Sequence, residues 1–125
     1  MTINKTNLPP VQIHFKENFP LETRCLTEDE EYAVVEILKV EYGLDKNGDN
    51  YDLTLFVSGI KSFSMSDDDQ ECFISWQLKP YGLEKICAKG TVGTGNLEMG
   101  ERFTEKECII ANIPKGEYSF EIIYV

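Results

Sequence analysis

Hydrophobic and polar residues alternate along most of this chain, most clearly in its last segment, residues 117–125. The even-numbered residues there are apolar or aromatic: Tyr118, Phe120, Ile122 and Tyr124. The odd-numbered residues between them are polar: Glu117, Ser119 and Glu121. A period of two is typical of a strand with one buried face. Pro114 lacks a backbone N–H and Gly116 accepts positive φ, so a corner at 111–116 is expected to separate this strand from one at 101–110.

The same alternation predicts strands further upstream. They are expected at residues 8–18, 21–26, 51–57, 72–78 and 86–92, with loops at 59–70 and 93–96. The first strand begins with Pro9 and Pro10, which suit a sheet edge because an edge tolerates missing donors. Trp76 is in phase with the apolar residues of its strand, so we expect it to anchor the core.

Residues 27–43 allow two interpretations. Thr27-Glu28-Asp29-Glu30 matches a helix capping box, and Gly43 would end a helix. Residues 32–42 are nevertheless rich in β-branched and aromatic side chains, and they precede a turn at 45–50 built on Asn47-Gly48. Extended segments on both sides of an Asn-Gly turn indicate a hairpin. We therefore predict a strand here and keep the helix as the alternative.

The length of 125 residues predicts one domain, 1–125, with residues 1–10 as a loosely ordered arm. Twelve basic and 22 acidic side chains give a net charge of −10, which disfavours nucleic acid and anionic lipid as partners. Such a charge serves solubility or docking on a basic partner. No leader or spanning segment is visible, so we expect no direct membrane insertion. The chain would be extracellular or on the cell surface if it comes from a longer precursor, and cytoplasmic if it is complete.

Four cysteines, Cys25, Cys72, Cys87 and Cys108, are widely spaced and form no Cys-x-x-Cys pair. A structural zinc site is therefore not expected. Two disulfides and four buried free thiols both agree with this pattern. If one bridge forms, we expect Cys72 with Cys108, because both lie in clearly predicted strands.

Catalytic and cofactor motifs are not found in the sequence. His14 is the one histidine and lies on the polar parity of its strand, so we expect it to face solvent. Nucleophilic catalysis needs a base held beside Ser or Cys, and no such arrangement can be argued. We therefore predict that the protein is not an enzyme and needs no cofactor.

A weak calcium match occurs at Asp45, Asn47 and Asp49, which fit the first three positions of a calcium loop. The glycine and the bidentate glutamate of such a loop are replaced by Asn50 and Phe56. Turn formation explains the segment better than metal binding does.

About seven strands with turns every eight to twelve residues predict an all-β fold, a two-sheet antiparallel β-sandwich. The corner Ile113-Pro114-Lys115-Gly116-Glu117-Tyr118 resembles a turn of fibronectin type III and immunoglobulin-like domains. By this resemblance Tyr118 is the corner tyrosine, whose hydroxyl bonds back to the backbone. Residues 73–123 are similar to uncharacterised immunoglobulin-like domains of bacterial surface and lipoprotein chains. The resemblance implies a binding, spacing or adhesion role.

We therefore expect a noncatalytic module that binds another protein through loops or a sheet edge. The loop residues considered for this contact are Asn47, Asp49, Asp67, Asp68 and Asp69. One alternative is an acidic intracellular inhibitor of phage or mobile-element type that blocks a basic nucleic-acid-binding groove. The other is a carbohydrate-binding module with an aromatic platform made from Tyr32, Tyr42, Tyr51 or Tyr81. The sequence does not indicate an oligomeric state.

Overall fold

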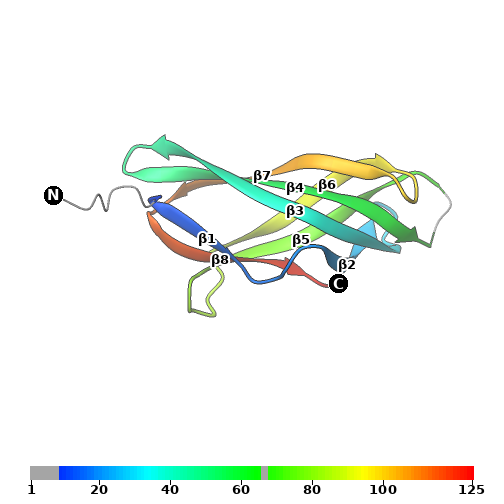
Figure 1. The fold of residues 1–125 in the computed structure, drawn as a ribbon, viewed down its shortest axis with the longest axis horizontal. Coiled ribbons are helices and arrows are strands. Elements are labelled where there is room, and N and C mark those ends of the chain that lie inside the picture. Colours follow the sequence, from blue (N-terminus) through cyan, green and yellow to red (C-terminus); the bar gives the residue numbers. More distant parts are fainter. Residues whose placement is uncertain (1–8, 66–67) are drawn as a thin grey trace.

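The computed structural model describes residues 9–65 and 68–125. Within these residues all regular structure is β-strand, which confirms the predicted all-β class and makes the helix alternative for residues 27–43 wrong (Figure 1). The strands are β1 (Val11–Phe15), β2 (Leu21–Thr27), β3 (Tyr32–Asn47), β4 (Asn50–Ser64), β5 (Gln70–Pro80), β6 (Ala88–Leu97), β7 (Arg102–Ile113) and β8 (Gly116–Ile123). They number eight, one more than expected. Of the arm predicted at 1–10, only Pro9 and Pro10 lie among the described residues.

The β3–β4 hairpin is longer than predicted at both ends. Its strands pair up to Asn47 and Asn50, and Gly48 takes a φ of 62° in the turn between them. At its far end β4 runs to Ser64, so the loop predicted at 59–70 is wrong in its first half. A Cβ at position 59 would lie 2.4 Å from the carbonyl oxygen of Glu36, so glycine here permits close strand packing. The loop predicted at 93–96 is likewise part of β6.

Hydrogen bonding joins the strands in the order β1-β8-β5-β2-β3-β4-β7, with β6 pairing on β5 as well. β1 runs parallel to β8, and the other pairs are antiparallel. The expected purely antiparallel arrangement is therefore wrong. A parallel pair needs a long connection, and the first and last strands have nearly the whole chain between them. β1 stands at the end of the strand order, which confirms the predicted edge position.

The link between β2 and β5 is short. It contains two register positions, Leu26 opposite Phe73 and Thr27 opposite Cys72. From Ser75 onward, β8 pairs with β5 instead. The strands thus form two groups, β1-β8-β5-β6 and β2-β3-β4-β7, and the strand ladder between them among the described residues is this two-residue one. Single hydrogen bonds also join the groups, from the Val125 amide to the Arg24 carbonyl at 3.2 Å and from the Lys61 side chain to the Leu97 carbonyl at 2.8 Å.

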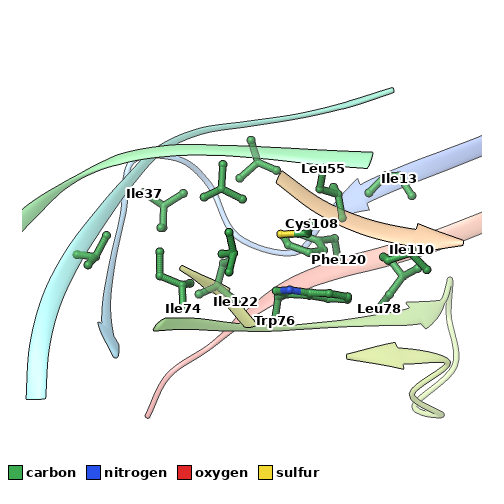
Figure 2. Close-up of a cluster of buried hydrophobic side chains, with 14 of the residues drawn as sticks. Ile13, Ile37, Leu55, Ile74, Trp76, Leu78, Cys108, Ile110, Phe120 and Ile122 are labelled. Carbon is green, nitrogen blue, oxygen red and sulfur yellow. The ribbon is translucent and has the colours of Figure 1, made fainter. Parts of the chain in front are cut away.

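The core lies between these two groups of strands (Figure 2). Ile37 and Leu55 of one group face Ile74 and Trp76 of the other. The Trp76 side chain is 6% exposed and packs against Phe120 at a centroid distance of 6.0 Å, so the predicted core position is observed.

The last strand follows its predicted parity with two exceptions. Tyr118, Phe120 and Ile122 are buried as expected. Tyr124 lies beyond the end of β8 and is 66% exposed, which makes the prediction of a buried face at that residue wrong. Glu121, predicted to face water, is 8% exposed because long side chains from neighbouring segments cover it.

Candidate binding site

The turn between β2 and β3 places several carboxylates at one end of the molecule. The amide of Thr27 donates to the Glu31 carbonyl at 2.8 Å, and the amide of Glu30 donates to the Thr27 carbonyl at 2.9 Å. These bonds close the turn, and Glu30 adopts a φ of 62° in it. Glu28, Asp29 and Glu30 are exposed as a result.

A hollow of about 300 Å³ lies beside this turn, on the face of β2, β5 and β6 opposite to the core. It is lined by Leu26, Thr27, Glu28, Glu30, Phe73, Ser75, Thr91 and Val125. Strand register explains why these residues line one hollow, because Leu26 pairs with Phe73 and Ser75 pairs with Thr91. Paired residues present their side chains on the same face. We call this feature the acidic hollow, because Glu28 and Glu30 line it together with apolar side chains.

Two tyrosines and an arginine form a stack beside the acidic hollow. The Arg24 guanidinium lies over the ring of Tyr32 at 4.5 Å and over the ring of Tyr124 at 5.1 Å. Its Nε donates to the carbonyl oxygen of Val125 at 2.5 Å. Tyr32 pairs with Leu26 of the hollow, so the stack and the hollow form one continuous surface.

Further carboxylates surround the acidic hollow and are tied to the fold. Asp29 accepts a hydrogen bond from the Gln70 side chain at 2.7 Å, and Glu28 accepts one from the Glu71 amide at 3.4 Å. The Glu71 carboxylate in turn accepts the amide of Gly95 at 3.0 Å. The first two bonds attach the start of β5 to the β2–β3 turn, and the third attaches it to β6.

The predicted loop residues are divided between two ends of β4. Asp68 and Asp69 are exposed and directly precede Gln70, so they belong to the end that carries the acidic hollow. Asp67 lies outside the described residues. Asn47 and Asp49 lie at the β3–β4 turn, at the other end of the strand. The structure therefore does not bring the two predicted loops together.

The β3–β4 turn is hydrogen-bonded to the end of β7. Asp52 accepts one bond from the Asn47 side chain at 3.0 Å and another from the Asn112 amide at 2.9 Å. These two bonds lower the pKa of Asp52 below its ordinary value. The Asn50 side chain donates to that of Asn112 at 3.1 Å. Asn47 therefore has a structural partner.

The calcium-loop geometry proposed from the sequence is not formed. Asp45 and Asn47 lie within β3, where Asp45 is paired across the hairpin with Asp52, and only Asp49 occupies the turn. Within residues 9–65 and 68–125, no three His, Cys, Asp or Glu side chains gather in a way that could hold a metal ion.

The four cysteines carry free thiols in the structure. The bridge expected between Cys72 and Cys108, if one forms, is not present, and Cys72 lies diagonally across from Cys25 in the β2–β5 register. Cys108 is buried among apolar side chains, and this burial raises its pKa to about 12. No local pattern indicates that Cys25 and Cys72 are neighbours, because their proximity depends on the register between β2 and β5.

The Tyr118 hydroxyl bonds back to the backbone of its corner, as expected. The Tyr118 hydroxyl donates to the carbonyl oxygen of Pro114 at 2.7 Å, and the amide of Gly116 donates to the Pro10 carbonyl at 2.9 Å. His14 lies at the surface as predicted. Its ring stacks on that of Tyr81 at 3.9 Å and its Nε2 is 3.2 Å from Glu117.

A charged cluster around Glu121 was not predicted from the sequence. Burial alone would raise the pKa of Glu121, but hydrogen bonds from Gln77, Lys79 and Lys16 lower it to about 2. Lys79 lies 3.0 Å from this carboxylate and Lys16 lies 3.2 Å from it. Burial raises the pKa of the neighbouring Glu17. No sequence signal could have identified the cluster, because its members come from three separate segments.

A comparison of the chain with known protein families, curated proteins and solved structures found no match. None of the described segments is a helix of the length and apolar character needed to cross a membrane. The geometry of the acidic hollow and its surroundings is therefore the basis for a functional proposal.

Proposed function

We propose that this protein is a noncatalytic binding module whose acidic hollow receives a lysine or arginine side chain from a basic segment of a partner protein. The observation that carries the proposal is that apolar Leu26 and Phe73 line the same hollow as the exposed residues Glu28 and Glu30. Lysine and arginine have an apolar stem and a charged head, and they bury the stem while the head stays near water or a carboxylate. The hollow offers both environments.

The surroundings of the hollow support the same partner chemistry. The exposed rings of Tyr32 and Tyr124 provide rigid contact area, which is typical of protein interfaces. The net charge of −10 would steer a basic partner toward the molecule. Because each exposed ion pair contributes only about 0.2–1 kcal/mol, we expect moderate and salt-dependent binding.

We also propose that the two groups of strands are the layers of an immunoglobulin-like sandwich. The support comes from the apolar side chains that face each other across the core and from the bond between Tyr118 and Pro114. A sandwich of this kind presents its loops at two opposite ends. The acidic hollow would then lie at one end, close to the β2–β3 turn.

The two alternatives differ in how much the structure supports them. Tyr42 and Tyr51 pack against the core, so they are not available for a carbohydrate-binding platform with Tyr32 and Tyr81. The acidic inhibitor would use the same carboxylates as the binding module. It requires a partner that binds nucleic acid, and competition by DNA or RNA for the partner distinguishes the two functions.

The proposal is tested with lysine- and arginine-containing peptides as probes, titrated into the labelled protein while amide chemical shifts are recorded. We expect shifts at Leu26, Phe73 and Thr91. The double variant Glu28→Gln/Glu30→Gln should weaken binding about tenfold, because two ion pairs are lost.

The control is Glu105→Gln/Glu107→Gln, which changes the net charge of the protein by the same amount. Both residues are exposed on β7, at the far end of the strand order. This variant should bind as the wild type does. An equal loss in both double variants, or binding that does not change between low and high salt, would contradict the proposal.

A further inference from the structure

Cys25 and Cys72 lie together at the junction of the two groups of strands. Thr27 is directly opposite Cys72 in the β2–β5 register, and Cys25 is two residues from Thr27, so its side chain is on the same face. Cys25 and Cys72 are thus diagonal neighbours across an antiparallel pair. Both are buried, and the Cys25 thiol donates to the Ala33 carbonyl at 3.6 Å.

The polar groups around this pair make one thiol the better nucleophile. The Lys61 side chain is 1% exposed, and its Nζ donates to the carbonyl oxygen of Leu97 at 2.8 Å. The neighbouring Cys25 thiol lowers the pKa of Cys72, and Lys61 and Thr94 act in the same direction. The same contact raises the pKa of Cys25. Cys72 is therefore the thiol that ionises first.

We propose that Cys25 and Cys72 form a disulfide that ties β2 to β5 when the protein meets a small-molecule disulfide. The Cys72 thiolate attacks one sulfur of the reagent, which forms a mixed disulfide and releases one thiolate. Cys25 then gives its proton to that thiolate or to water and attacks the Cys72 sulfur, which releases the second thiol. The two cysteines lose two electrons and two protons, and the reagent is reduced to two thiols.

The position of the pair determines when the exchange takes place. Both sulfur atoms are shielded in the folded protein, so a reagent reaches them when β2 is separated from β5. The ladder between these strands has two register positions, extended by the bond from the Glu28 amide to the Glu71 carbonyl at 3.1 Å, so a local opening here breaks few backbone hydrogen bonds. We expect fast oxidation during refolding and slow oxidation of the native protein.

The test is to refold the protein with oxidised glutathione, denature it at low pH, and map its disulfides by mass spectrometry. A loss of two hydrogen atoms in mass and a peptide joining Cys25 to Cys72 are expected, with Cys87 and Cys108 remaining as free thiols. Cys25→Ser should stop the exchange at the mixed disulfide of Cys72 with glutathione, whereas Cys108→Ser should form the bridge and leave only Cys87 free. A bridge from Cys72 to Cys108, or four thiols that remain free, would overturn the proposal.

A second measurement does not depend on the variants folding well. The thermal midpoint of the oxidised wild type should be higher than that of the same sample after reduction, by several degrees. Cys87→Ser, which changes a cysteine outside the pair, should show the same shift on reduction. If reduction leaves the midpoint of the wild type unchanged, the disulfide does not link the two strands.

Discussion

Glu30 is held in a left-handed backbone conformation at the rim of the acidic hollow, with a φ of 62°. A residue with a Cβ pays about 1–2 kcal/mol for this conformation. Strained residues persist where the surrounding structure fixes them, and they are frequent at binding sites. The position of Glu30 on the hollow therefore supports a role in binding.

Glu30→Gly should stabilise the protein and weaken its binding of basic peptides. Glycine removes the strain but increases the freedom of the unfolded chain, so we expect a net gain of about 0.5–1 kcal/mol in the free energy of unfolding. Urea denaturation measures this change. The control is Glu31→Gly in the same turn, where φ is not positive, and a small loss of stability is expected. A loss of similar size in both variants would show that the strain is not present.

Tyr118→Phe should destabilise the protein by about 1 kcal/mol, because it removes the bond from the hydroxyl to the Pro114 carbonyl. The ring remains buried, so the change isolates the hydroxyl. Tyr124→Phe serves as the control and should have little effect, because that side chain is exposed. Equal denaturation midpoints for wild type and Tyr118→Phe would contradict a structural role for the corner.

Individual residues were predictable from the sequence where the signal was local. Tyr118 follows Pro114 and Gly116 in a recognisable corner, and Trp76 lies in the middle of an alternating strand. Glu121 and the Cys25–Cys72 pair were not predictable. Their environments depend on strands that are distant in sequence, and alternation alone does not state which strands become neighbours.

Two predicted loops, 59–70 and 93–96, are partly or wholly strand. The first prediction rests on polar residues and the run Asp67-Asp68-Asp69, and the second on two glycines, because both features usually mark loops. Gly59 and Gly93 instead lie in strands at points of close approach: a Cβ would lie 2.4 Å from the Glu36 carbonyl at position 59 and 2.7 Å from the Glu71 carboxylate at position 93. Local sequence cannot distinguish a turn glycine from a packing glycine.

Gly59→Ala should destabilise the protein by about 2–4 kcal/mol, because the new methyl group overlaps the backbone of β3 and the strands must separate. Gly43→Ala is a matched control in the same hairpin. A Cβ at position 43 meets only the Phe56 ring at 3.9 Å, so we expect no loss and a small gain from the lower chain entropy. Comparable effects of the two changes in chemical denaturation would show that β3 and β4 are not as close as described.

At the scale of the whole molecule, the charged cluster around Glu121 should control stability in acid. Its pKa is about 2 in the folded protein and 4.5 ordinarily, so the stabilisation it provides is fully present above pH 4.5 and is lost as the pH falls toward 2. The groups facing it are Lys16, Glu17, Gln77 and Lys79. Glu17 acts in the opposite direction, because its pKa is raised.

Glu121→Gln should therefore flatten the loss of stability between pH 4.5 and 2, as measured by urea denaturation at several pH values. At neutral pH the variant should be less stable than the wild type, because Lys79 loses a buried partner. Glu22→Gln on the exposed side of β2 is the control and should keep the pH dependence of the wild type. An unchanged profile in Glu121→Gln would contradict this account.

The proposed disulfide would also change the stability of the whole molecule. Closing a loop of about 48 residues stabilises a protein by roughly 4 kcal/mol if the effect is entropic. This is a large fraction of the 5–15 kcal/mol that is usual for a domain. The stability of this protein would consequently differ between reducing and oxidising compartments.

The two-residue ladder between β2 and β5 also has a mechanical consequence. If the molecule is stretched across its two groups of strands, few backbone bonds bear the load: those at Leu26 and Thr27, and the bonds from Glu28 to Glu71 and from Val125 to Arg24. The β3–β4 hairpin, paired along most of its length, would resist the same pull far longer. A covalent bridge between Cys25 and Cys72 would carry part of this tension across the junction.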